Sequence, residues 1–168
     1  MERIETTQTR VCKTWDFRGA CSRFATGVTI VTSLRSDGAP VGMTVSSFTS
    51  VSLDPPLVLV CLHERCSILQ DLVQTGRFGL NILASHQQGL SARFADQVKD
   101  RFQGLDWRHG SSGVPLLSDV LATMECDVDR AYSCADHQIL IGRVSTMSSH
   151  DGAPLVRFSS TYHSLIER

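Results

Sequence analysis

The segment Val41–Pro56, VGMTVSSFTSVSLDPP, combines residue types that suit a polar ligand carrying phosphate. Ser and Thr fill six of its positions, and it contains no Lys, Arg, Glu or His. Hydroxyl residues alternate with Val, Met, Phe and Leu, which favours extended chain. A buried strand rarely carries so many hydroxyls, because each one needs a hydrogen-bond partner. Short hydroxyls and free backbone N–H groups suit a flat polar ring and a phosphate, but composition alone favours the alternative, an ordinary Ser/Thr-rich edge strand.

The pair Asp136–His137 is a second group that could do chemistry. A carboxylate beside an imidazole can orient the ring, which can then hydrogen-bond a ligand. The alternative is a structural histidine held in its turn by Asp136. The chain also has six cysteines but no CxxC pair, and His63 between Cys61 and Cys66 has no second ligand pair nearby. We therefore predict reduced thiols and no metal site.

Composition and motifs exclude several classes of protein. The net charge of the 168-residue chain is −1, so we expect no basic surface for nucleic acid or anionic lipid. No apolar run reaches the roughly 20 residues of a membrane span, and the N-terminus does not resemble a signal peptide, so we expect a cytoplasmic protein. The sequence contains no GxGxxG, Walker A, HExxH or GxSxG motif. Any catalysis would therefore depend on a bound organic cofactor.

The residues outside the strands are predicted to form three short helices and two polar segments. Residues 1–13 are polar and aperiodic, and we predict that they are disordered. Apolar spacing predicts helices over Asp16–Ala25, Ser67–Thr75 and His86–Phe94. The polar stretch Asp96–Gly113 is expected to be a long loop. The predicted apolar face of the first helix consists of Phe17, Ala20, Cys21 and Phe24.

Short β-branched or alternating runs predict about seven strands. Met124–Val128 alternates so cleanly that Glu125 is expected on a solvated face. The close spacing of the strands, without regular crossover helices, predicts an antiparallel, barrel-like single domain over residues 14–168. The expected strands are Val28–Ser33, Val41–Val51, Leu57–Leu62, Phe78–Leu83, Met124–Val128, Gln138–Thr146 and Leu155–Ser159.

Ordered segments along most of the chain carry a resemblance to a known family. They are FATGVTIVTS (24–33), GMTVSSFTSVSLDPPLVLVCL (42–62), FGLNIL (78–83), GLSARFA (89–95), ATMECDV (122–128), ADHQILIGRV (135–144) and APLVRF with Tyr162-His163. Together they resemble the short-chain flavin reductases, the reductase components of two-component flavin-dependent monooxygenases. The resemblance implies a mainly β fold with a few short helices, the antiparallel FMN-binding split barrel, assembled as a homodimer. Ala135 departs from the Gly that is common in the family, at a turn expected to need positive φ.

The resemblance also implies which residues contact the ligands. His137 is expected to be the catalytic residue and to bind the nicotinamide nucleotide, with Thr26 and Tyr162 as further substrate contacts. For three of the flavin contacts a structural role is the alternative: Ser67 could cap a helix, Asn81 could satisfy a strand, and Arg93 could be a solvated helix charge. The expected flavin contacts are Met43, Thr44, Val45, Ser46, Ser47, Cys61, Leu62, Ser67, Asn81, Ser91, Arg93 and Phe94.

The activity that the resemblance implies is that of an NAD(P)H:flavin oxidoreductase. Hydride would pass from C4 of NADH or NADPH to N5 of FAD or FMN, and the reduced flavin would leave for a partner monooxygenase. The alternative is a flavin-binding split-barrel protein without NAD(P)H reductase activity. The sequence does not choose between the two flavins or between the two nucleotides.

Overall fold

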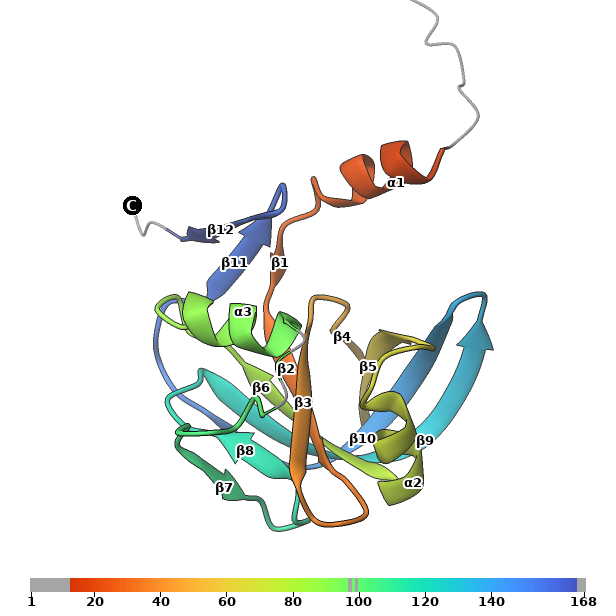
Figure 1. Ribbon diagram of the computed structural model, residues 1–168, viewed down its shortest axis with the longest axis vertical. Coiled ribbons are helices and arrows are strands. Elements are labelled where there is room, and N and C mark those ends of the chain that lie inside the picture. The colour runs from red at the N-terminus through yellow and green to blue at the C-terminus, as the bar shows by residue number, and fades with distance from the viewer. Residues whose placement is uncertain (1–12, 97, 99, 166–168) are drawn as a thin grey trace, which may run out of the picture.

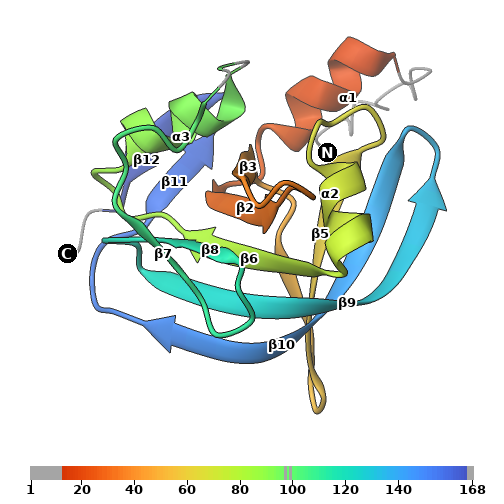
Figure 2. The ribbon, with the colours of Figure 1, turned by 60° about the horizontal axis from the view of Figure 1, so that its bottom comes forward.

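The computed structural model describes residues 13–96, 98 and 100–165. Of the segment predicted to be disordered, all but Lys13 lies outside the described residues. Within them the chain is mainly β, and every strand pair is antiparallel, as predicted. Figures 1 and 2 show helices α2 and α3 lying on opposite sides of strands β2 and β3.

Seven strands form the main sheet, in the order β3-β2-β6-β9-β10-β5-β4. Most arise where the sequence shows β-branched or alternating runs. The single strand predicted over Val41–Val51 is wrong, because the chain leaves β3 after Val45 and forms β4 at the opposite edge of the sheet. β9 and β10 continue beyond the predicted ranges. Their outer halves are polar and exposed, so alternation does not mark them, and mutual pairing defines them instead. The bounds are β2 Thr29–Leu34, β3 Pro40–Val45, β4 Thr49–Leu53, β5 Pro56–His63, β6 Arg77–Ile82, β9 Ala122–Cys134 and β10 His137–Ser149.

Two smaller sheets complete the β structure. β1 (Thr26–Gly27) pairs with β11 (Leu155–Phe158), which pairs with β12 (Thr161–Ser164). β7 (Trp107–His109) pairs with β8 (Pro115–Leu117). The stretch predicted to be a long loop therefore contains part of a hairpin, because three residues of it find a partner strand just downstream.

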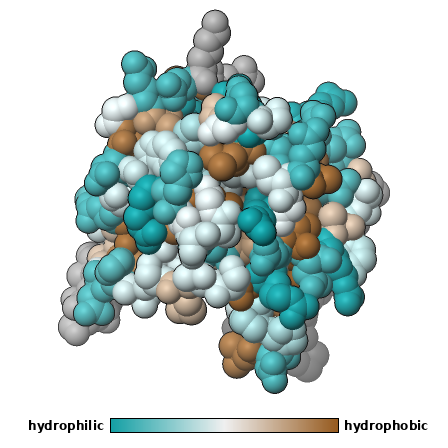
Figure 3. All heavy atoms as spheres, turned by 90° about the horizontal axis from the view of Figure 1, so that it is seen from below, coloured by the Kyte–Doolittle hydropathy of each residue, from teal (hydrophilic) through white to brown (hydrophobic). Residues whose placement is uncertain are grey.

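The three predicted helices are present with shifted bounds: α1 Thr14–Cys21, α2 Leu69–Thr75 and α3 Gln88–Ala95. The expected inward face of the first helix is wrong. α1 buries no residue, and Phe17 and Phe24 are 58% and 77% exposed. Figure 1 shows α1 held away from the main sheet, and its apolar side chains Trp15 and Phe17 stay exposed to solvent within the part of the chain that the structure describes. Figure 3 shows further apolar patches between polar side chains on another face.

The apolar core has two parts, one beside each of the other helices. The first lies between the main sheet and α2, around Phe78 and Leu72. The second lies beneath α3, around Phe94 and Phe102. Gly42 of β3 allows the Phe94 ring to approach closely, because a Cβ at Gly42 would lie 2.8 Å from Cε1 of that ring. This contact packs α3 directly against β3.

Glu125 corrects the predicted face of β9. Its side chain is buried, and its carboxylate accepts hydrogen bonds of 2.5 to 3.0 Å from the backbone N–H and hydroxyl groups of Ser111 and Ser112. The loop between β7 and β8 thus covers a face that alternation alone left open to solvent. Burial acts to raise the pKa of the Glu125 carboxyl, but these hydrogen bonds outweigh it, and the pKa lies below its ordinary value.

Candidate functional site

Two hydrogen bonds connect the end of β3, which belongs to the predicted flavin segment, with α3 and β12. The Thr44 hydroxyl donates to the backbone carbonyl of Ser91 at 2.7 Å, and the Ser91 hydroxyl shares a hydrogen bond with the Tyr162 hydroxyl at 2.8 Å. Arg157 of β11 is the register partner of both Tyr162 and Thr26. The predicted flavin contact Thr44 and the predicted substrate contacts Thr26 and Tyr162 are therefore brought into one region.

The two adjacent serines after β3 have different surroundings. The Ser47 hydroxyl donates to the backbone carbonyl of Cys61 at 2.8 Å and accepts the Cys61 backbone N–H at 2.9 Å. Ser46 is exposed, and its hydroxyl has no partner among the described residues. Ser47 therefore fastens the chain after β3 to β5, while Ser46 keeps its hydroxyl available to a ligand. The Ser47 hydroxyl therefore has a structural role, and its contact with the flavin stays a prediction.

Three predicted flavin contacts from separate parts of the chain line one cavity of about 570 Å³. Met43 comes from β3, Ser67 from the link before α2, and Phe94 from α3. The volume falls within the range of roughly 300–1,000 Å³ typical of small-molecule sites. The full lining is Arg35, Pro40, Val41, Gly42, Met43, Arg65, Cys66, Ser67, Ile68, Asp71, Phe94, Ala95, Val98 and Arg101.

Three arginines give this cavity a positive lining that the sequence did not suggest. The Arg101 guanidinium donates to the backbone carbonyls of Gly42 and Asp96, so it also holds the loop after α3 against β3. Arg35 and Arg65 make no side-chain hydrogen bond or ion pair shorter than 4 Å with the described residues, although Arg35 acts electrostatically on Asp71 of the same lining. Exposed guanidinium groups at a cavity with both polar and apolar walls suit a ligand with phosphate groups.

The hydroxyl of Ser67 is also available at this cavity. Ser67 does not cap α2, because the helix begins at Leu69 and its N-cap residue, Ile68, provides no side-chain hydrogen bond. The exposed Ser67 hydroxyl has no partner among the described residues. An apolar wall, a free hydroxyl and two free guanidinium groups together fit a flavin nucleotide, whose ring is flat and whose tail is anionic.

Other predicted contacts serve the fold. Asn81 is fully buried; its amide donates to the Ile30 carbonyl at 3.0 Å and accepts the Leu117 N–H at 2.8 Å, so the strand alternative is correct. The Val45 and Leu62 side chains belong to the core, which leaves only their backbone groups for a ligand. Cys61 has a partly buried thiol, whose pKa is raised by burial and then by nearby Cys134, so it stays protonated at neutral pH.

Arg93 takes neither of the roles considered from the sequence. Its guanidinium donates to the backbone carbonyls of Asp100 and Gln103, at 3.3 and 2.5 Å. These bonds tie the loop that follows α3 to the helix itself. The Arg93 guanidinium therefore has a structural role, and Arg93 is not among the residues that line the cavity.

His137 begins β10, directly after a turn that contains Ala135 and Asp136. Ala135 has φ of 51°, so the turn does use the positive φ expected there. The Nδ1 atom of His137 lies 2.7 Å from Oδ1 of Asp136, and this hydrogen bond holds the pKa of the Asp136 carboxyl below its ordinary value. The His137 ring also meets the ring of His63 edge-on, with centroids 5.2 Å apart.

His63 and the three arginines of the cavity were not predicted from the sequence as residues of the site. His63 was considered only as a metal ligand next to Cys61, and the arginines lie in polar turns without periodicity. Strand register is the signal that could have pointed to His63. The β9–β10 hairpin closes at residues 134–137, and the pairing of β10 with β5 then places His63 opposite His137.

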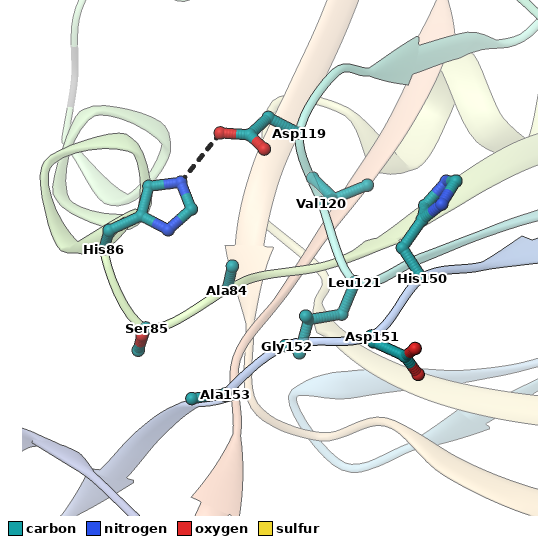
Figure 4. Close-up of a pocket in the computed structure, with 10 residues that line it drawn as sticks. All are labelled: Ala84, Ser85, His86, Asp119, Val120, Leu121, His150, Asp151, Gly152 and Ala153. Carbon is teal, nitrogen blue, oxygen red and sulfur yellow. Dashed lines mark hydrogen bonds and ion pairs between the residues drawn. The ribbon is translucent and has the colours of Figure 1, made fainter.

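A second cavity, of about 440 Å³, lies elsewhere on the molecule. His86 and Asp119 form a pair on its wall, with Nε2 and Oδ2 2.8 Å apart, and His150 lies on the other side (Figure 4). None of the predicted flavin or nucleotide contacts lines this cavity.

The cysteines of the described part of the chain are not arranged for a metal ion. Residues 13–96, 98 and 100–165 hold no cluster of three His, Cys, Asp or Glu side chains arranged for a metal ion. The five cysteines in this range carry free thiols, as predicted. No helix among the described residues is long and apolar enough to cross a membrane.

The antiparallel barrel and its cavity define the class of protein, and comparisons name the family. The family profile of the flavin reductase like domain matches residues 21–165, so the chain belongs to the flavin reductase like family. The SgcE6 NADH:FAD oxidoreductase of Streptomyces globisporus C-1027, solved in complex with NAD and FAD fragments, shares 35% identity. It superposes with a TM-score of 0.86, covering 90% of this chain and 92% of that one. The fold is the split barrel of these reductases.

Two relatives illustrate the range of lengths in the family. A Rhizobium meliloti (strain 1021) protein named "Probable flavin reductase" is 46% identical over 132 residues, which are 79% of this chain but 42% of the relative. The reductase subunit HsaB of a flavin-dependent monooxygenase from Rhodococcus jostii (strain RHA1) is 37% identical over 147 residues, 87% of this chain and 75% of the relative. This chain thus spans less than half of one relative and three quarters of the other.

Proposed function

We propose that the protein is an NADH-dependent flavin reductase that supplies reduced flavin to a separate monooxygenase. The observation that carries this proposal is the cavity that joins Met43, Ser67 and Phe94 under two unpaired arginines. Bound there, a flavin would supply the hydride-accepting ring. Membership of the family and the named activity of the SgcE6 relative support NADH as the reductant and FAD as a flavin that fits.

The residues of the chain would bind and orient the two ligands in this reaction. Met43 offers apolar surface to the flavin ring and fully buried Phe94 supports the wall behind it, while the Ser67 hydroxyl, Arg35 and Arg65 suit the phosphate groups of the flavin. His137 offers an imidazole for the nicotinamide nucleotide. Holding two planar ligands together contributes proximity, which is a large part of the rate enhancement of such a transfer. No covalent step by the protein is required.

The proposal includes a homodimer. Trp15, Phe17 and Phe24 in and near α1, together with Val51 and Leu53 of β4, are exposed large apolar side chains. Soluble domains rarely leave such residues uncovered, and a second copy of the chain would cover them. Sedimentation at micromolar concentration is expected to show a dimer, and an active monomer would contradict this part of the proposal.

The test of the activity is anaerobic oxidation of NADH by the purified protein with FAD or FMN. We expect one NADH to be oxidised for each flavin that is reduced, as measured by the loss of nicotinamide absorbance and of oxidised-flavin absorbance. If the absorbance spectrum of flavin changes on binding to the protein, but neither NADH nor NADPH reduces the bound flavin, the result would instead support a flavin-binding protein without reductase activity.

A further inference from the structure

The turn that carries His137 is fastened to the end of β5 through His63. His63 and His137 are register partners on adjacent strands, so their side chains project from the same face of the sheet. The Glu64 backbone N–H donates to the Asp136 carbonyl at 2.9 Å, which closes the turn against β5. Asp136 therefore lies between two imidazoles that come from different strands.

The hydrogen bonds around Asp136 assign the tautomers of both rings. Nδ1 of His63 accepts the Arg65 backbone N–H at 3.0 Å, so the neutral ring carries its proton on Nε2. That Nε2 lies 3.8 Å from Oδ2 of Asp136. Nδ1 of His137 lies 2.7 Å from Oδ1 of the same carboxylate and is the donor of that hydrogen bond. Neutral His137 then has its lone pair on Nε2, which meets no partner among the described residues.

We propose that His63 is a positioning residue for His137: its ring packs edge-on against the His137 ring and its Nε2 faces Oδ2 of Asp136, so that Asp136 keeps His137 with Nδ1 protonated and Nε2 free to accept a hydrogen bond from the nicotinamide nucleotide. The inference rests on the proposed function, because it needs His137 to contact that ligand. The carboxamide N–H and the ribose hydroxyls are the donors of the nucleotide that suit a neutral Nε2. All three side chains are partly exposed, at 42% for His63, 44% for His137 and 67% for Asp136.

This exposure explains why a second anchor matters. An aspartate that is two-thirds exposed can rotate away from a single partner, and His137 would then mix its two neutral tautomers. The Nε2–H of neutral His63 points its positive end at Oδ2 of Asp136, while Nδ1 of His137 donates to Oδ1. The two oxygens of one carboxylate thus each face a different imidazole.

The test is a double-mutant cycle in NADH oxidation with FAD. His63→Ala is expected to raise KM for NADH about 3- to 10-fold, the range for loss of one hydrogen bond, with kcat and flavin affinity little changed. In a His137→Ala background the same substitution is expected to have no further effect, because His63 acts through His137. His63→Phe keeps the ring edge but lacks the N–H and should behave like His63→Ala, whereas His63→Gln keeps a donor and should restore KM.

A spectroscopic readout and a matched control complete the design. The ring 15N shifts of His137 are expected to report one neutral tautomer in the wild type and a mixture in His63→Ala. His86→Ala removes another exposed His–Asp pair, at the second cavity (Figure 4), and is expected to leave KM for NADH unchanged.

The outcomes separate this inference from the proposed function. An unchanged KM in His63→Ala, or a loss of the same size in the His137→Ala background, would overturn the role of His63 alone. An unchanged KM in His137→Ala would overturn the nucleotide contact and, with it, this inference. Absence of NADH oxidation by the wild-type protein would instead overturn the proposed function.

Discussion

The adjacent residues Ser46 and Ser47 provide a sharp test of the site, because only one hydroxyl is free. Ser47→Ala removes a hydroxyl that donates to the Cys61 carbonyl and accepts the Cys61 N–H. Each hydrogen bond contributes about 0.5–1.5 kcal/mol net, so the loss should be about 1–3 kcal/mol of unfolding free energy. For a chain of this length that corresponds to a fall in Tm of about 2–12 °C.

Ser46→Ala is expected to have the opposite profile. Its exposed hydroxyl has no protein partner among the described residues, so removal should leave Tm unchanged. If the hydroxyl binds the flavin, Kd should rise about 2- to 13-fold. Thermal melts without flavin and fluorescence titrations with FAD and FMN measure the two quantities, with exposed Ser50→Ala of β4 as control and Ser47→Thr as the variant that keeps the hydroxyl.

Two results would refute this reasoning. A wild-type melting temperature for Ser47→Ala would show that its hydroxyl does not fasten the chain after β3 to β5. A loss of stability in Ser46→Ala that equals the loss in Ser47→Ala would show that both serines are structural, and the flavin would then have to be held from other residues.

Three further predictions concern the turn, the buried carboxylate and the cavity. Ala135→Gly should raise the free energy of unfolding by about 0.5–1 kcal/mol, measured by urea unfolding. Positive φ costs a residue with a Cβ about 1–2 kcal/mol, and the greater chain entropy of glycine in the unfolded state cancels part of the gain. A less stable variant would contradict this prediction. The lowered pKa of Glu125 means that its contribution is present above the ordinary value of 4.5 and is lost as pH falls through the folded-state pKa. Glu125→Gln should therefore lower the free energy of unfolding by about 1–3 kcal/mol at neutral pH. Urea unfolding at several pH values should show the difference in stability between wild type and variant becoming smaller in acid. A difference that stays constant with pH would argue against a stabilising Glu125 carboxylate. Arg65→Ala should raise the flavin Kd about tenfold at low salt and by less at high salt, because salt screens the attraction between the guanidinium and the phosphate. Arg108→Ala, at an exposed arginine away from the cavity, should leave the flavin Kd unchanged. If the two variants have the same flavin Kd, Arg65 is not part of the site.

Local sequence determined much of the fold and of the family membership. The β-branched runs and alternating segments predicted most strands correctly, because side-chain burial on a pleated strand repeats every two residues. The spacing of Gly76 after an apolar helical run predicted where α2 ends, and Gly76 does take φ of 65° there. The ordered segments from residue 24 to residue 163 were enough to identify the family that the profile match confirms.

Only the tertiary structure decided which polar side chains are free to act. Ser46 and Ser47 have the same side chain and adjacent positions, yet only Ser47 lies against the backbone of β5. The alternation of polar and apolar residues along β9 assigns Glu125 to the solvated face, but the loop that contains Ser111 and Ser112 covers its side chain. His63 meets Asp136 across strands that are more than 70 residues apart in the chain. Periodicity assigns a side chain to a face, and the segments that pack on that face from elsewhere in the chain determine whether it binds a ligand or the protein itself.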